Sequence, residues 1–223
     1  MANRPVFIPN FNDAGFVNIR NIDFDWFPGF AVVQKQKSIK SLRKIFFEET
    51  GISNILEISS KSENKLGIDA SAFNLKLSLD GLNATVESIY QGSKVFEKGG
   101  PYKDLYLKSS IEAKKDIRIK ESGSLICFNI NGEKWSLEDD FYSWLYMNAL
   151  LQNINISEEI LKYKAFTDIE FNPKKSYNCQ ANSAAIYVSL VSKNMDFEVI
   201  KNINEFKKVF KKLSTENTQL DMF

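Results

Sequence analysis

The hydrophobic and polar positions of the chain follow two periods, and each period predicts a type of element. From Phe16 to Trp26 apolar and polar residues alternate, which predicts one or two short strands that end at Pro28-Gly29. From Gln36 to Thr50 apolar residues recur every three or four positions, which predicts a basic amphipathic helix that ends at Gly51. A short strand is expected at Ile55–Ile58.

The stretch from Ser59 to Gly81 is rich in polar and turn-forming residues, and it is predicted to be mostly loop. Its last leucines alternate with polar residues and lead into a turn at Asp80-Gly81. A helix is predicted from Thr85 to Phe96, because Thr85 is a favourable N-cap and Glu87 places a carboxylate in the first turn.

The rest of the sequence predicts one hairpin and several helices. The hairpin runs from Leu125 to Trp135, with its turn at Asn131-Gly132. The helices are expected at Ser110–Glu121, Leu137–Asn153, from a cap at Ser157 to Tyr163, at Gln180–Lys193 and at Asn204–Leu213. Helices outnumber strands, so the predicted class is α+β, mainly α with a small β component.

No repeat, low-complexity tract or long linker divides the chain. We therefore expect a single domain over residues 1–213, followed by a disordered tail over residues 214–223. No stretch of about eighteen apolar residues occurs, and Pro5 and Pro9 interrupt the region where a signal peptide has its apolar run. Cys127 and Cys179 lie in contexts typical of reduced core cysteines, so a cytoplasmic protein is expected.

Charge and composition limit the partners and the catalytic groups that the chain can use. The 29 Lys and Arg oppose 28 Asp and Glu, a net charge of +1, so any basic surface must be local. Histidine is absent from the 223 residues. Its absence excludes a histidine general base, Ser-His and Cys-His nucleophile pairs, and metal sites that depend on imidazole.

The most informative pattern lies within the predicted helix from Thr85 to Phe96. At 100° per residue, Glu87, Gln91 and Lys94 fall within about 60° of one another, beside Tyr90. A carboxylate, an amide and an amine then share one face. One interpretation is a solvated polar stripe on a surface helix. The alternative is a buried site, which the apolar residues on the other faces of this helix favour.

The sequence around this helix resembles the NADAR family. Thr85–Phe96 (TVESIYQGSKVF) is similar to the family's signature helix, and the preceding Leu79-Asp80-Gly81 to its turn. Ser71–Leu75 (SAFNL) resembles its Ser-Asn-Phe loop, with Ala72 where the family generally has Asn. Further similarities are Ala113-Lys114-Lys115 to its Ala-Lys-Arg element, Trp135 to its Trp before a long helix, and Asn178 to its late Asn.

Three segments resemble one branch of the family more closely, namely Gly92–Tyr102, Phe166–Lys175 and Asn178–Ala181. This branch comprises the NADAR antitoxins partnered with DarT-type toxins, which attach ADP-ribose to guanine bases in DNA. The resemblance implies a compact NADAR fold and an ADP-ribosyl hydrolase that removes ADP-ribose from the guanine exocyclic amine. It implies no metal, and we expect no cofactor. The implied partners are ADP-ribosylated DNA and the cognate toxin, with no membrane partner.

The residues present permit this chemistry. Cleavage of a C–N bond at the anomeric carbon develops positive charge on the sugar and negative charge on the leaving nitrogen, so an anion and a proton donor are needed. Glu87 can supply the anion. Lys94 can donate a proton or, as a neutral amine, attack the ring-opened sugar and form an imine. We prefer the nucleophile as a hypothesis.

Other side chains are candidates for the phosphates, the ribose and the bases. Lysines suit the phosphates, aromatic rings suit the bases, and Asp168 suits a ribose hydroxyl. The candidate phosphate ligands are Lys61, Lys65, Lys114 and Lys115, each of which is otherwise a solvated lysine. The expected substrate-binding set is Lys61, Phe73, Asn74, Tyr90, Gln91, Trp135, Asp168 and Asn178.

Two alternatives to a DNA-guanine hydrolase remain open. The chain could be an N-glycosidase that acts on a small nucleotide-like metabolite, because spacing does not separate the two substrates. It could also be a non-catalytic antitoxin that neutralises its toxin by binding. In that case replacing Glu87 or Lys94 by Ala would leave protection intact.

Overall fold

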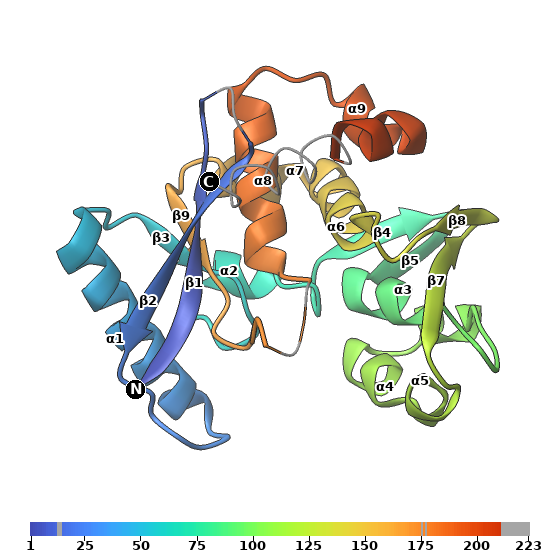
Figure 1. Cartoon of the computed structure of the whole chain (residues 1–223), viewed down its shortest axis with the longest axis horizontal. Coiled ribbons are helices and arrows are strands. Elements are labelled where there is room, and N and C mark those ends of the chain that lie inside the picture. Colours follow the sequence, from blue (N-terminus) through green and yellow to red (C-terminus); the bar gives the residue numbers. More distant parts are fainter. Residues whose placement is uncertain (13–14, 175, 177, 211–223) are drawn as a thin grey trace, which may run out of the picture. The chain divides into compact units, whose positions relative to one another are not determined.

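The computed structural model of the chain describes residues 1–12, 15–174, 176 and 178–210. These residues form two compact units, each built from two stretches of the chain. Unit 1 comprises Met1–Ser71 and Ile154–Met195, and unit 2 comprises Ala72–Asn153 and the described residues from Asp196 onward. Both units mix helices with strands, which confirms the α+β class (Figure 1). The single domain over residues 1–213 stays a prediction.

Unit 1 is built on a four-stranded sheet with the strand order β2-β1-β9-β3. β1 (Ala2–Pro9) and β2 (Val17–Phe24) pair antiparallel along their whole length. β9 (Ala165–Thr167) is antiparallel to β1, and β3 (Ile55–Glu57) is parallel to β9. Two parallel strands must be joined by a long connection. Here the chain between β3 and β9 leaves unit 1 after Ser71, runs through unit 2 and returns to unit 1 at Ile154.

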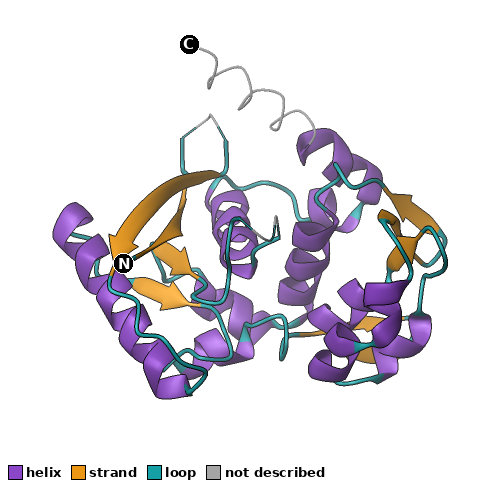
Figure 2. Cartoon of the chain, turned by 60° about the horizontal axis from the view of Figure 1, so that its bottom comes forward, coloured by secondary structure: helices purple, strands orange, loops and turns teal. Residues whose placement is uncertain are grey.

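The strands of unit 1 lie between the helices α1 (Val32–Thr50) and α8 (Gln180–Ser192), as both views show (Figures 1 and 2). α1 ends where predicted, because Gly51 adopts a left-handed φ of 73° and donates its N–H to the Phe47 carbonyl. Two shorter helices, α2 (Lys65–Asp69) and α7 (Ile154–Ile160), belong to the same unit. The core between α1 and the sheet contains Val6, Ile22, Phe24, Ile39, Leu42, Phe46, Ile55, Ala165 and Ile169.

Unit 2 begins with a hairpin of β4 (Lys76–Leu79) and β5 (Leu82–Thr85), which runs directly into α3 (Val86–Gly92). A three-stranded antiparallel sheet follows, with the order β6 (Lys94–Phe96), β7 (Leu125–Ile130) and β8 (Glu133–Trp135). The β7–β8 turn is at Asn131-Gly132, as predicted, and both residues have positive φ.

The helices of unit 2 surround these strands with short segments and one long apolar helix. They are the 3₁₀ helix η1 (Lys103–Leu107), α4 (Ser110–Lys115), α5 (Ile117–Glu121), α6 (Phe141–Gln152), α9 (Glu198–Lys201) and the helical residues 203–210. The core is aromatic and contains Phe128, Trp135, Phe141, Trp144 and Phe206. In the part of the chain that the structure describes, no helix is both long and apolar enough to cross a membrane.

Several predicted elements differ from the structure. The helix from Thr85 ends at Gly92 instead of Phe96, because Lys94–Phe96 form the strand β6 and pair with β7. The helix predicted at 110–121 is broken at Asp116, whose backbone leaves the helical region and whose carboxylate accepts from the Arg118 N–H. Ser157 lies inside α7 and does not begin it.

Other differences concern elements that the sequence pattern did not reveal. β1, β5 and α2 are absent from the prediction, because each is short or contains prolines or polar residues at many positions. The last predicted helix is present at 203–210, while its final three residues and the predicted tail at 214–223 lie outside the described residues.

Candidate functional site

The start of α3 is fixed by the loop that precedes the β4–β5 hairpin. The Thr85 hydroxyl accepts a hydrogen bond from the Ser88 N–H (3.2 Å), which confirms the predicted N-cap. The Glu87 N–H donates to the Ala72 carbonyl (2.9 Å), and the Val86 N–H donates to the Leu75 carbonyl (2.9 Å). The first turn of α3 is therefore bonded to the 72–75 loop.

Glu87, Gln91 and Lys94 form a continuous chain of hydrogen bonds. Gln91 Nε2 donates to Glu87 Oε1 (2.9 Å), and Lys94 Nζ donates to Gln91 Oε1 (2.8 Å). Glu87 and Gln91 are each 5% exposed, so the interpretation of a solvated surface stripe is wrong. The three side chains meet although Lys94 lies on β6, because the chain turns back beside α3 at Ser93.

Lys94 is held in a largely apolar environment. Its Nζ lies 4.8 Å from the centroid of the Tyr90 ring, a cation–π distance. The Tyr90 ring in turn packs on Phe128 and Tyr142, with centroids 5.2 Å apart in each pair. Burial lowers the pKa of Lys94 to about 8, Glu87 opposes this shift, and Lys114 adds to it. At pH 7 about one tenth of Lys94 is thus a neutral amine, far more than for an ordinary lysine.

Lys114 approaches the same carboxylate from α4. Its Nζ lies 3.6 Å from Glu87 Oε1 and 5.0 Å from the centroid of the Phe73 ring. Phe73 is half-buried, and the neighbouring Asn74 is exposed. Two amines therefore lie close to Glu87: the half-buried Lys94, joined to it through Gln91, and Lys114, whose side chain is 57% exposed.

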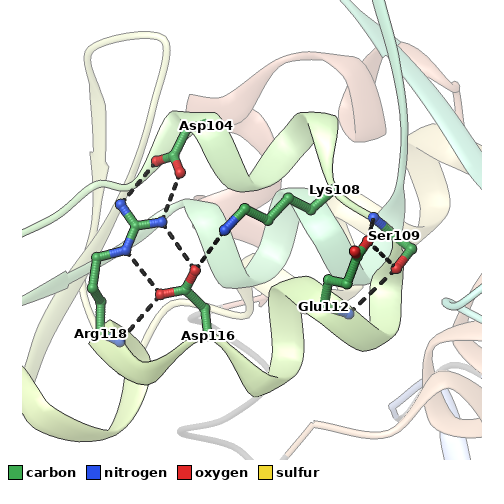
Figure 3. A network of polar contacts seen from close by, with 6 residues as sticks. All are labelled: Asp104, Lys108, Ser109, Glu112, Asp116 and Arg118. Carbon is green, nitrogen blue, oxygen red and sulfur yellow. Dashed lines mark hydrogen bonds and ion pairs between the residues drawn. The ribbon is translucent and has the colours of Figure 1, made fainter.

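An ionic network connects η1 to the break between α4 and α5 (Figure 3). Arg118 donates two hydrogen bonds to the Asp104 carboxylate (3.1 and 2.6 Å) and two to the Asp116 carboxylate (2.8 and 3.1 Å). Lys108 Nζ also donates to Asp116 (2.8 Å). Single exposed ion pairs contribute little, but a shared network orients several groups at once. This network holds the C-terminal end of α4, which carries Lys114.

The N-terminal end of α4 is fixed by a capping box. The Ser109 hydroxyl accepts from the Glu112 N–H, and the Glu112 carboxylate accepts from the Ser109 N–H (3.0 Å; Figure 3). The Ser110 hydroxyl donates to the Phe73 carbonyl (2.9 Å). Both ends of α4 are therefore anchored, and the helix is bonded to the loop that holds Phe73.

Trp135, an expected stacking residue, lies in the core of unit 2. It is completely buried, with its ring centroid 5.3 Å from that of Phe141 and 5.0 Å from that of Trp144. Lys207 Nζ lies 4.4 Å from the Trp135 ring centroid. The ring is thus packed on the protein's own side chains, and its expected contact with a base stays a prediction.

The remaining expected residues, Lys61, Asp168 and Asn178, belong to unit 1. All three are half-buried. The Asp168 carboxylate accepts from Gln180 Nε2 (3.0 Å). Burial and the neighbouring carboxylate of Glu57 raise the pKa of Asp168. Of the ten expected site residues, unit 2 therefore contains seven, and Glu87, Gln91, Lys94 and Tyr90 lie in direct contact there.

Glu57 is a buried carboxylate that the sequence analysis did not single out. It accepts hydrogen bonds from the hydroxyls of Ser59 (2.7 Å) and Thr167 (2.6 Å) and from the Ile169 N–H (2.9 Å). Burial raises the pKa of Glu57. Its position in an otherwise apolar strand, Ile55–Ile58, was the available signal. Because its partners come from the end of β9, Glu57 links β3 to that strand.

Metal-ligating side chains do not gather in the described ranges, where no group of three or more carboxylates and thiols is placed to hold a metal ion. The family model of the DarT1-associated NADAR antitoxins matches residues 2–220. The chain belongs to this antitoxin family. The resemblance to the NADAR antitoxins partnered with DarT-type toxins is thereby confirmed. A comparison with curated proteins finds no match.

Membership of the NADAR antitoxin family gives the chain an antitoxin role and associates it with a DarT1 toxin. The family match extends over both units, so it includes unit 1 as well as the Glu87–Lys94 chain of unit 2. What the family description leaves open is the reaction, which depends on what the side chains of the site can do.

Proposed function

We propose that this antitoxin is an ADP-ribosyl hydrolase that removes ADP-ribose from guanine bases in DNA, with Glu87 and Lys94 at the reaction centre. The observation that carries the proposal is the chain of hydrogen bonds from Glu87 through Gln91 to Lys94, in which partial burial lowers the pKa of the lysine to about 8. A partly desolvated amine near a carboxylate, in a protein without histidine, is suited to covalent catalysis.

The proposed reaction begins on the ring-opened form of the modified guanine, in which C1″ of the ribose is joined to the guanine nitrogen as a protonated imine. The neutral Lys94 Nζ attacks C1″ and forms a new C–N bond. One proton moves from Nζ to the guanine nitrogen, the bond from C1″ to that nitrogen breaks, and unmodified guanine leaves. Water then adds to the C1″=Nζ imine, which releases ADP-ribose and regenerates the Lys94 amine.

The neighbouring residues have separate roles in this scheme. The Glu87 carboxylate carries the proton between the two nitrogens and stabilises the cationic imines, which are the charged species of the reaction. The Gln91 amide holds Glu87 and Lys94 at a fixed separation. In the same scheme the exposed Lys114 binds the pyrophosphate and Phe73, whose ring lies 5.0 Å from Lys114 Nζ, stacks on a base.

The test is incubation of the protein with a DNA oligonucleotide that carries one ADP-ribosylated guanine, followed by mass spectrometry of the DNA. We expect release of unmodified DNA by the wild type and its loss in Glu87→Gln and Lys94→Ala. The matched control is Lys120→Ala, which removes an exposed lysine of α5 that is outside the expected site. Borohydride added during turnover is expected to leave an ADP-ribose adduct on Lys94.

Other outcomes identify the alternatives. Hydrolysis without a borohydride adduct would assign Lys94 to proton donation. Unchanged DNA from a folded protein would refute the DNA hydrolase, and the next substrates to test would be small N-glycosides. Protection of cells by Glu87→Ala and Lys94→Ala would show that the antitoxin acts by binding its toxin.

A further inference from the structure

A loop joins β2 to α1 (Figure 1). Apolar side chains of this loop and of the first turn of α1 are exposed to solvent. Phe30 is fully exposed, and Phe27, Val32 and Val33 are between 36% and 59% exposed. We call these four residues the Phe30 tip. The loop is bonded to α1, because the Phe27 N–H donates to the Ser38 hydroxyl (3.0 Å). The tip is therefore held in place, and a cluster of exposed apolar side chains of this kind is typical of a binding surface.

The chain segment around the tip is rich in cations, three of which pair with carboxylates outside the segment: Lys35 with Glu170 (3.2 Å), Lys40 with Glu63 and Lys44 with Glu48. The 22 residues from Trp26 to Phe47 contain five cations and no carboxylate, although the whole chain has a net charge of +1. At 100° per residue Lys37, Lys40 and Lys44 fall within about 60° of one another on α1 and span about 10 Å of its axis. The five cations are Lys35, Lys37, Lys40, Arg43 and Lys44.

We call Lys37, Lys40 and Lys44 the lysine stripe of α1, and these three lysines are accessible to an anion. Among the described residues, no carboxylate lies within ion-pair distance of Lys37, whose Nζ is 6.0 Å from the centroid of the Phe27 ring. Lys40 pairs with Glu63 (2.9 Å) and Lys44 with Glu48 (3.8 Å). Both lysine side chains are more than 60% exposed, and such exposed pairs contribute little, so a phosphate can replace the carboxylate.

An exposed aromatic ring beside a stripe of cations is the combination by which proteins bind single-stranded nucleic acid, with bases stacked on rings and phosphates on lysines. We propose that the Phe30 tip and the lysine stripe of α1 bind single-stranded DNA. Phe30 stacks on an unpaired base, and Lys37 contacts the backbone phosphates. This inference rests on the proposed function, because DNA is the substrate there.

The first test measures binding of the full-length protein to an unmodified, fluorescein-labelled single-stranded DNA by anisotropy. Phe30→Ala is expected to weaken binding about ten-fold, since stacking on one ring contributes a factor of this order. Phe30→Trp is expected to restore it. Lys37→Ala is expected to weaken binding and to reduce the salt dependence by about one phosphate contact. Phe11→Ala, which removes another exposed phenylalanine of unit 1, is the matched control and is expected to bind like the wild type.

The second test separates this inference from the proposed function. Hydrolysis is measured on ADP-ribosylated DNA and on ADP-ribosyl-guanosine, and Phe30→Ala is expected to raise KM for DNA about ten-fold relative to KM for the nucleoside. If the wild type hydrolyses neither substrate, the proposed function fails, while the anisotropy result still decides the DNA contact. DNA binding by Phe30→Ala that equals the wild type overturns the inference. If that variant also loses binding to the toxin, the Phe30 tip is a protein interface.

Discussion

The lowered pKa of Lys94 predicts how the proposed hydrolysis depends on pH. A lysine with a pKa of about 8 is neutral in about 10% of molecules at pH 7 and in about 90% at pH 9, whereas an ordinary lysine is neutral in about 0.03% at pH 7. If the neutral amine attacks, kcat/KM on modified DNA should rise about ten-fold between pH 7 and pH 9 and then level off.

Replacing Lys114 tests the cause of this dependence. The Lys114 cation helps to lower the pKa of Lys94, so Lys114→Gln should raise that pKa and move the midpoint of the profile to higher pH. Lys115→Gln should leave the midpoint unchanged. The assay is the initial rate of guanine release from the modified oligonucleotide, measured by mass spectrometry at pH values between 6 and 10. A rate that falls as pH rises through 8 would refute the nucleophile, because a proton donor loses activity when it deprotonates.

Three further predictions concern stability. Lys94→Met should be more stable than the wild type at pH 7 by up to about 3 kcal/mol in thermal unfolding, because burial disfavours the charged amine in the folded state. The difference in stability between the two proteins should narrow as the pH rises from 8 towards 10.5. A difference that stays constant with pH would contradict this cause. Thr85→Ala should lose about 1 kcal/mol in urea unfolding, because it removes the N-cap of α3, whereas Thr85→Ser should retain most of it. Asp116→Ala should lose about 1 kcal/mol or more, because it removes the α5 cap and the shared partner of Lys108 and Arg118, and added salt should reduce the difference.

The sequence was most informative where a structure depends on local residues. The cap at Thr85, the left-handed end at Gly51 and the turn at Asn131-Gly132 are each decided within four or five residues, and all three are confirmed. The contact of Glu87 with Gln91 is local in the same way, because residues four apart meet on one face of a helix.

The rest of the site depends on contacts between residues far apart in the chain. Lys94 was placed correctly beside Gln91 but for the wrong reason, because it lies on a strand that turns back beside α3. The approach of Lys114 to Glu87 depends on how α4 packs, and no spacing predicts it. The burial of Trp135 also depends on distant contacts. A tryptophan at the end of a hairpin is expected to be accessible, and only the packing of α6 against it shows that it is buried.

The position of Lys94 at the first residue of β6 makes the site sensitive to strand register. Lys94 pairs with Phe128 of β7, and the register shifts between Val95 and Phe96. On a strand, a slip of one residue turns a side chain to the opposite face, whereas on a helix it turns by only 100°. A chain that paired β6 with β7 one residue out of step could retain most of its helices and its core, and yet its lysine would point away from Glu87. For the proposed hydrolase, such a slip is expected to abolish activity while leaving the helix content almost unchanged.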